Sequence, residues 1–225
     1  MSSLYKFPKA AVFGKVIAKS KIYEHASPGR KVKGLFVKEV EKITWSYKLS
    51  PATINLPASP GVQELQIFTI VLKAGALSQE VLQTIDRAIP SPIVFELTYG
   101  GRTKYTACYK RPSQADKSKW VVSSYFQSGW IKNDAPIREL PVVLNMGLLY
   151  QFFLTGLSPL PFRPGEDLDG LVARVDRLRV MEGEAEKLEI RIEKEKQFNR
   201  RVELNRTLNE LKTMIRSLSH DHAPK

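Results

Sequence analysis

The sequence predicts an α+β fold: a mixed sheet of about five strands with one strand–helix–strand crossover, followed by a helical tail that resembles a coiled coil. Three observations lead to this prediction. Apolar residues alternate with polar ones in several segments of residues 42–125, and a helix-period stripe lies between two of these segments. Apolar residues, many of them leucine, then recur every three or four residues in much of the stretch from 168 to 218.

Residues 8–19 are predicted to form a short helix. Pro8 suits the first helical position, where its missing N–H costs nothing. Four apolar residues follow at helical spacing, namely Val12, Phe13, Val16 and Ile17. Residues 28–35 place basic side chains around a glycine, so we expect an exposed loop that leads into another short helix.

Two strands are predicted next. In residues 42–49 apolar side chains alternate with lysines and hydroxyl residues, so we expect the core face to carry Ile43, Trp45, Tyr47 and Leu49. Residues 51–61 are rich in proline and indicate a surface connection. Residues 64–72 are apolar on both faces, which is typical of a central strand.

The following segment predicts a parallel crossover. Ser78 offers an N-cap, an apolar stripe runs to Ile89, and Pro90 ends the helix. A third strand is expected over residues 93–99. Two strands joined by a helix at this spacing almost always form a right-handed parallel unit.

Gly100-Gly101 turns the chain into a strand over residues 103–110. The larger apolar residues of both strands are odd-numbered, so they share a face only if the loop contains an odd number of residues. We therefore expect a three-residue loop with a glycine at positive φ. The opposite face would then be polar, with Glu96, Thr98, Lys104, Thr106, Cys108 and Lys110.

The remaining pattern sets the domain layout. We expect a fifth strand at 120–125 and a buried helix near 142–155. Residues 1–160 would then form a basic α+β domain, 161–167 a Pro/Gly linker, 168–219 a helical tail and 220–225 a disordered end. Phase shifts in the leucine pattern argue against one uninterrupted dimeric zipper. A helical hairpin and a tail that folds back on the domain both remain open.

Basic charge is concentrated in the first three-quarters of the chain. The net charge is +12, and residues 1–165 hold 22 Lys/Arg against 10 Asp/Glu, whereas residues 166–219 hold 12 of each. This distribution favours a polyanionic partner. Two clusters are expected to contact a DNA or RNA backbone: Lys9, Lys15, Lys19, Arg30, Lys31 and Lys33, and then Arg102, Lys104, Lys110, Arg111, Lys117 and Lys119.

No sequence pattern indicates a cofactor. The chain lacks phosphate-cradling glycine loops, and its three histidines suggest no catalytic triad, so we expect neither a cofactor nor a metal site. A divergent Mg²⁺-dependent nuclease would need clustered carboxylates, and Glu64, Asp86 and Glu96 are the candidates. We expect Glu96 to pair instead with a cross-strand lysine or arginine.

The location is predicted to be cytoplasmic. Cys108 is the single cysteine, which fits a reducing compartment. The N-terminus lacks the continuous apolar core of a signal peptide. The longest apolar stretch, residues 142–157, is interrupted by Asn145 and Gln151 and is too short and polar to span a bilayer, so we expect no membrane partner.

Three stretches resemble a known family: Phe7-Pro8-Lys9 with the segment 16–23, Ile43 to Leu56, and Glu195 to Asn205. Together they resemble the bacterial family catalogued as domain of unknown function 4391, over nearly the whole chain. The resemblance implies no catalytic residues. It does imply a setting, because members of that family are often encoded beside helicases and DNA methyltransferases of restriction-like defence loci.

We therefore predict a non-enzymatic accessory subunit of a restriction-like or antiviral defence system. Its basic domain would bind DNA or RNA, and its tail would bind a protein: a helicase, a DNA methyltransferase or a second copy of the chain. A protein-only assembly adaptor is the alternative, and a divergent nuclease is the third reading. The predicted partner-binding residues are Phe198, Val202, Leu204, Leu208, Leu211 and Ile215.

Overall fold

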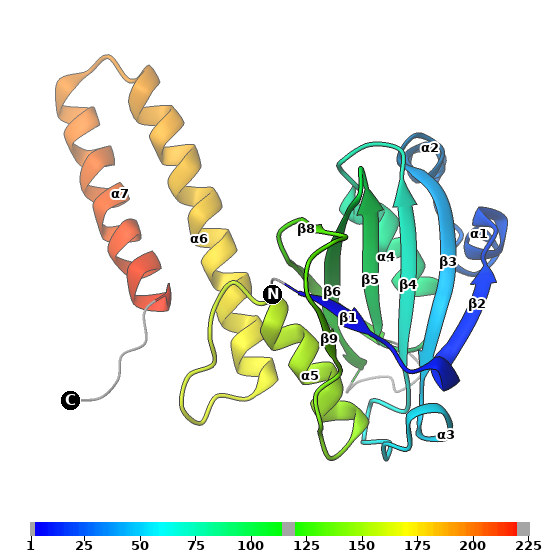
Figure 1. The fold of residues 1–225 in the computed structure, drawn as a ribbon. Coiled ribbons are helices and arrows are strands. Elements are labelled where there is room, and N and C mark those ends of the chain that lie inside the picture. Colours follow the sequence, from blue (N-terminus) through cyan, green and yellow to red (C-terminus); the bar gives the residue numbers. More distant parts are fainter. Residues whose placement is uncertain (1–2, 114–119, 220–225) are drawn as a thin grey trace. The chain divides into compact units, whose positions relative to one another are not determined.

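The computed structural model describes residues 3–113 and 120–219 (Figure 1). Contacts within the chain divide it into two compact units, residues 1–158 and residues 159–225. The predicted disordered end, residues 220–225, lies outside the described residues.

The first unit contains strands and short helices in alternation. Its elements are β1 (Leu4–Lys6), η1 (Lys9–Ala11), β2 (Val12–Val16), α1 (Lys19–Ala26), α2 (Arg30–Glu39), β3 (Val40–Leu49), α3 (Pro51–Ile54), β4 (Leu65–Leu72), α4 (Gln79–Ala88), β5 (Ile93–Tyr99), β6 (Arg102–Pro112), β7 (Trp120–Gln127), β8 (Ile131–Lys132), β9 (Ile137–Glu139) and α5 (Met146–Leu157).

The main sheet confirms the predicted mixed α+β class, with more strands than expected. Its order is β2-β3-β4-β5-β6-β7, and β8 pairs with β6 to give seven strands. β4 and β5 run parallel and flank the helix α4, as the crossover prediction requires, whereas the other pairs in this sheet are antiparallel. A small second sheet pairs β1 with β9.

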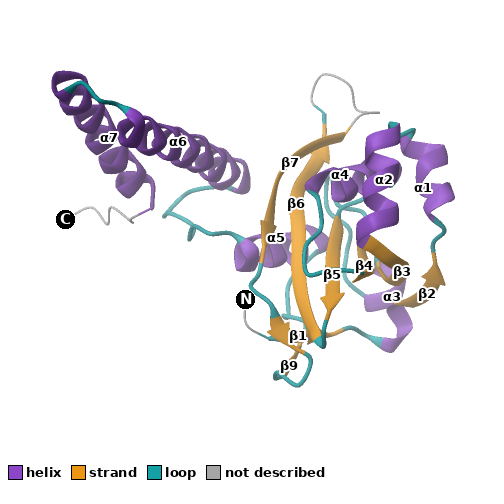
Figure 2. Ribbon diagram, turned by 90° about the horizontal axis from the view of Figure 1, so that it is seen from above, coloured by secondary structure: helices purple, strands orange, loops and turns teal. Residues whose placement is uncertain are grey.

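Helices α1, α2 and α4 lie together on one side of the sheet (Figure 2). Their apolar faces bury one core with the side chains of β3, β4 and β5 that point the same way, including Phe36, Phe68, Ile70, Ile85 and Phe95. β4 is buried along almost its whole length, as its unbroken apolar sequence predicted.

Helix α5 packs on β6 and β7 through aromatic side chains. Tyr5 of β1 makes edge contacts with Tyr105 and Phe153. The Tyr150 hydroxyl accepts the Lys110 backbone N–H at 2.9 Å and donates to the Cys108 carbonyl. The helix is therefore bonded directly to the second half of β6.

One predicted helix is absent, and another begins later than expected. Residues 8–19 form a 3-10 turn and strand β2 instead of one helix, because Gly14 adopts φ +66°, which interrupts a right-handed helix. The helix expected near 142–155 begins at Met146, where the Asn145 side chain accepts the Leu148 N–H. Val142 and Leu144, which precede this helix, are exposed.

The parity argument for the loop after β5 is also wrong. Tyr99 pairs with Arg102, so the turn has two residues, and Gly100 and Gly101 adopt φ +53° and +72°. Two consecutive positive φ angles are what a tight two-residue hairpin needs. The pairing then sets Phe95 opposite Thr106 and Glu96 opposite Tyr105, so the expected polar face is divided between the two faces of the sheet.

A bulge changes the predicted face of β3. The register shifts between Trp45 and Tyr47, with Trp45 opposite Phe68 and Tyr47 opposite Ile67. Ile43 and Trp45 therefore contribute to the helix-covered core, whereas Tyr47 contacts Phe7.

The second unit is a helical hairpin of α6 (Leu168–Lys194) and α7 (Phe198–Ser219). The tail therefore forms the helical hairpin that the sequence left open as one alternative. Its small core joins Met181 and Ala185 of α6 to Leu208 and Leu211 of α7. No helix within residues 3–113 and 120–219 combines the length and apolarity needed to cross a membrane.

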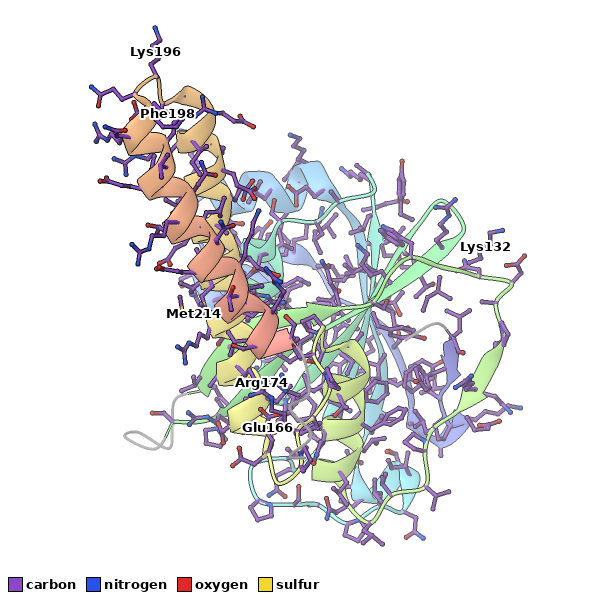
Figure 3. The ribbon with its side chains drawn as sticks, turned by 90° about the vertical axis from the view of Figure 1, so that its left-hand side faces the viewer. Lys132, Glu166, Arg174, Lys196, Phe198 and Met214 are labelled. Carbon is purple, nitrogen blue, oxygen red and sulfur yellow. The ribbon has the colours of Figure 1, made fainter. Side chains whose placement is uncertain are left out.

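Two arginines close the open end of this hairpin. Arg174 is buried and binds Glu166 with two hydrogen bonds of 2.7 and 2.8 Å, and it also donates to the Leu218 carbonyl at 3.0 Å. Arg163 donates to the Ser217 carbonyl at 2.8 Å. These two carbonyls near the end of α7 are thereby satisfied by charged donors, and Figure 3 labels Glu166 and Arg174 at this end.

Candidate nucleic-acid interface

A groove of about 460 Å³ lies at the carboxyl ends of the parallel strands β4 and β5. We call it the carboxyl-edge groove. Its lining includes Glu41, Lys73, Tyr99, Arg102 and Asn133. In open, mostly parallel α/β sheets, ligands bind outside the carboxyl ends of the strands. The single parallel pair here makes this edge a candidate by analogy.

Local geometry holds the groove in shape. The two-glycine turn brings Arg102 directly beside Tyr99. Asn133 donates its backbone N–H to the Gly101 carbonyl at 3.0 Å, and its side chain accepts the Thr103 hydroxyl at 2.9 Å. The Tyr99 side chain remains 44% exposed, which leaves an aromatic surface at the rim.

Two cations line this groove, and two more stand on strand positions paired with its lining residues. Lys73 and Arg102 line it, Lys42 pairs in register with the lining residue Val71, and Lys132 pairs with Arg102. Within the described residues, no carboxylate lies within 4 Å of these four basic groups. All four are exposed, and Figure 3 shows the Lys132 side chain projecting outward.

Of these four, the sequence prediction included only Arg102. The other three come from separate segments of the chain, so clustering along the sequence could not reveal them as one group. The available signal was the crossover itself. A predicted parallel pair places the residues after both strands at one edge.

The predicted second basic cluster does not exist as one surface. Its members Arg102 and Lys110 lie eight residues apart on the extended strand β6, which corresponds to about 26 Å. Lys104 is half-buried with its Nζ 4.8 Å from the Trp130 ring centre, and Arg111 is half-buried near the opposite end of the strand. Lys117 and Lys119 lie outside the described residues.

Lys110 is wrong as a phosphate contact, because its side chain is buried. Its Nζ lies 3.6 Å from an Asp86 carboxylate oxygen and donates to the carbonyls of Asp86, Ile89 and, at 3.1 Å, Ser91. These carbonyls lie at the end of helix α4 and just after it. The two-residue turn caused this placement, because it directs Lys110 towards α4 rather than towards solvent.

The Asp86 carboxylate has further partners in this buried network. It accepts the Tyr125 hydroxyl, and the Cys108 sulfur lies 3.5 Å away. Burial raises the pKa of Asp86, an effect that Lys110 opposes, and burial lowers the pKa of Lys110. The network is structural: it joins α4, β6 and β7 inside the core.

The first basic cluster has mixed roles. Lys19 donates to the carbonyls of Phe36 and Val40 at 2.9 and 2.6 Å, and burial lowers its pKa. Lys31 lies 3.7 Å from Glu80, whereas Lys33 and Lys15 sit over the aromatic rings of Tyr23 and Phe13. Lys9 and Arg30 are exposed. These residues spread over η1, β2, α1 and α2 rather than lining a groove.

The nuclease candidates are not brought together. Asp86 belongs to the buried network, and Glu64 accepts from Lys48 at 2.7 Å just before β4. Glu96 lies opposite Tyr105 and accepts the Thr69 hydroxyl at 3.0 Å, so its expected pairing with a lysine or arginine is wrong. Burial raises its pKa. The described residues contain no group of three potential metal ligands.

The predicted partner-binding residues of the tail separate into two groups. Leu208 and Leu211 are buried in the hairpin core, and Ile215 packs against it, so these three hold the hairpin together rather than presenting a docking surface. Leu204 is half-buried. Phe198 and Val202 are 77% and 53% exposed and remain available to a partner.

Comparison with known proteins identifies the family. A family model described as "Domain of unknown function (DUF4391)" matches residues 6–215. The chain belongs to this family. No curated protein and no solved structure matches it. Membership spans both structural units, so the sheet unit and the hairpin are parts of one family architecture.

Proposed function

We propose that this protein is a non-enzymatic accessory subunit that binds the backbone of DNA or RNA in the carboxyl-edge groove and binds a protein through the exposed side of α7. One observation carries the proposal: among the described residues, Lys73 and Arg102 line that groove, Lys42 and Lys132 pair in register with its lining residues, and none of the four has a carboxylate within 4 Å. Such cations at a concave edge attract phosphates, because binding releases the counterions of the nucleic acid.

The chemistry of the rim suits a sequence-independent contact. Lysine and arginine neutralise phosphates without reading bases. The exposed Tyr99 ring offers a surface on which an unpaired base can stack, and the Asn133 amide adds a polar contact. The proposal of a role in a restriction-like defence system, beside a helicase or DNA methyltransferase, rests on the family resemblance.

The second candidate is a protein-only assembly adaptor. The exposed apolar side chains Phe198 and Val202 on α7 favour it, because large exposed apolar groups often mark protein contacts. In that case the basic groups of the first unit would meet an acidic protein. Purification with a protein partner, and without nucleic acid, would support this candidate.

The salt dependence of binding tests the proposal. The full chain is titrated into fluorescently labelled duplex DNA, single-stranded DNA and RNA between about 50 and 200 mM salt. Replacement of Lys42, Lys73, Arg102 and Lys132 by alanine should lower the slope of log K against log salt by about 3.6 on duplex DNA, since each phosphate contact contributes about 0.9.

A charge-matched control uses the other basic surface. Alanine at Lys9, Lys15, Arg30 and Lys31 removes the same charge from the same unit, and it should leave the slope nearly unchanged. An equal loss in both variants would indicate diffuse attraction by net charge and would overturn the groove assignment. No binding by the unmodified chain even at low salt would remove the polyanion proposal altogether.

A further inference from the structure

The outer side of α7 carries two parallel rows of side chains. One row steps every four residues through Val202, Arg206, Glu210 and Met214, and the neighbouring row contains Asn205, Asn209 and Thr213. A groove of about 870 Å³ is lined by these same residues. Rows at a spacing of four are the ridges that one helix inserts into the grooves of another.

This surface is unoccupied within the hairpin. Val202 and Met214 are 53% and 46% exposed, whereas the side of α7 that meets α6 buries Leu208 and Leu211. Figure 3 labels Phe198 near the hairpin tip and Met214 towards the other end of α7. The tip itself is ordered by local bonds, because the Glu195 side chain accepts the Gln197 N–H and lies 3.4 Å from Arg200.

The four-residue row is complementary to itself when reversed. An antiparallel copy related by a two-fold axis near position 208 sets Val202 against Met214 of the copy and Arg206 against Glu210 of the copy. Each contact occurs twice, as a two-fold interface requires. Apolar groups then meet apolar groups at both ends, and opposite charges meet in the middle.

We infer that the outer side of α7 binds a second copy of this chain, as an antiparallel helix pair centred near residue 208. The inference names the partner of the tail and rests on the protein-binding part of the proposed function. It does not depend on the groove in the first unit. A stable dimer usually buries about 800 Å² on each partner, more than one helix crossing supplies, so association is expected to be reversible and dependent on concentration.

Charge reversal in the middle of the row tests the inference. Arg206→Glu alone places a glutamate opposite Glu210 of the copy, and Glu210→Arg alone places an arginine opposite Arg206 of the copy. Each variant should self-associate about tenfold more weakly in sedimentation equilibrium, since two exposed pairs become repulsive. Arg206 and Glu210 also form an exposed i,i+4 pair at 3.2 Å within α7, so each reversal changes the helix itself and needs a control.

Mixing the two variants is that control and should restore association. In the mixed pair, a chain with two acidic groups at positions 206 and 210 meets a chain with two basic groups there, while the intrachain repulsion in each protein is unchanged. Weakening in each variant alone, together with recovery on mixing, would support the antiparallel register, because a parallel pair would already be repulsive in the unmodified chain. Equal weakness before and after mixing, or a monomeric mass for the unmodified chain at every concentration, would overturn the inference.

Cysteine cross-linking provides a second readout of the same geometry. A Val202→Cys protein mixed with a Met214→Cys protein should form a disulfide between chains, whereas either alone should not, because identical positions would lie about 18 Å apart along the helices. Glu203→Cys is the matched control, because position 203 lies outside the row that faces the copy. The native Cys108 is buried and should not form the cross-link. These measurements use no nucleic acid, so failure here is distinguishable from failure of the groove to bind DNA or RNA.

Discussion

The two ends of strand β6 use their cations in opposite ways. Arg102 lies at the carboxyl-edge groove, exposed and without a carboxylate partner among the described residues. At the other end, Lys110 is buried and bound to Asp86 and to carbonyls at the end of α4. A basic sequence therefore overstates the basic surface, because part of its positive charge is bound inside the fold.

The same use of cations recurs at other helix ends. Lys19 and Lys73 donate to carbonyls in the last turn of α2 or just after it, and Arg163 and Arg174 donate to carbonyls near the end of α7. A helix C-terminus leaves carbonyls without partners and carries partial negative charge, so a cation is favourable there. Lys19, Arg163 and Arg174 thereby stabilise the fold, even where the net charge suggests a ligand. Lys73 differs from them, because it is exposed and also lines the carboxyl-edge groove.

Removal of Lys110 should give the largest effect on stability. Lys110→Met leaves the Asp86 carboxylate buried without its cation and frees the carbonyls at the end of α4. Breaking a buried pair in this way typically costs about 3–5 kcal/mol, and urea unfolding followed by tryptophan fluorescence measures it. A cost below about 1 kcal/mol, the range of an exposed pair, would mean that Lys110 does not stabilise the buried Asp86 carboxylate and the end of α4.

A double substitution separates the stability contributed by the Asp86–Lys110 ion pair from that contributed by packing at the same site. Asp86→Leu combined with Lys110→Met replaces both charges by apolar groups, and it should recover much of the stability lost in Lys110→Met, because apolar replacement of a whole buried pair is often neutral. Failure to recover would show that the bonds of Tyr125 and Cys108 to Asp86 contribute more than the ion pair does.

Arg174→Ala should have the next largest effect, confined to the hairpin. It removes both hydrogen bonds to Glu166 and the donor to Leu218, at an expected cost of about 3 kcal/mol. Hydrogen exchange should show lost protection in the C-terminal turns of α7, with β4 and β5 unchanged. Equal loss in the sheet would contradict the division into two units.

Acid should weaken the Arg174–Glu166 pair in the unmodified protein. Arg174 lowers the pKa of Glu166, so the pair contributes its full stability above the ordinary glutamate pKa of about 4.3. That stability is lost as pH falls through the lower pKa of the folded state. In Arg174→Ala this part of the pH dependence should be absent.

The sequence was sufficient for the class of the fold but not for the faces of its strands. Hydrophobic periodicity correctly predicted β4, the crossover through α4 and the helical character of the tail. It failed where one residue decides the register: the two-glycine turn after Tyr99 and the bulge between Trp45 and Tyr47. A shift of one residue exchanges the two faces of a strand, so small errors in loops relocate whole sets of side chains.

The candidate site was less predictable for the same reason. Lys110 and Glu96 lie on the two strands that this turn joins. The sequence pattern therefore predicts a surface position for Lys110 and an ion pair for Glu96, and both predictions are wrong. The groove cations come from four segments that are distant in sequence, and only the order of the strands in the sheet brings them together.

Glu96 contrasts with Lys110, because it is a half-buried acid without a cation partner among the described residues. Burial raises its pKa, so the folded state holds its proton more tightly than the unfolded state does. Stability attributable to this group is therefore greatest below pH about 4.3 and falls as pH rises through the folded pKa. Glu96→Gln should remove this decline, because the amide still accepts from Thr69 and carries no charge.

Chemical denaturation at several pH values measures the effect of Glu96→Gln. Each unit by which the folded pKa exceeds the ordinary value corresponds to about 1.4 kcal/mol of relative stabilisation at neutral pH. The variant and the unmodified chain should converge at acidic pH. A variant that is less stable at neutral pH than at acidic pH, relative to the unmodified chain, would contradict the raised pKa.

Lys104 should show the smallest effect, and it completes the comparison along β6. Its Nζ lies 4.8 Å from the Trp130 ring centre, so Lys104→Ala should cost about 0.5–1 kcal/mol, the range of a partly exposed cation–π contact. Because its ammonium is engaged with the ring, its removal should leave the salt slope of nucleic-acid binding unchanged. Arg102→Ala, two residues earlier, should do the opposite: almost no change in stability and a slope lower by about 0.9 on duplex DNA. If both substitutions change the slope equally, binding follows the net charge of the protein. The position of a β6 cation relative to the groove would then have no effect.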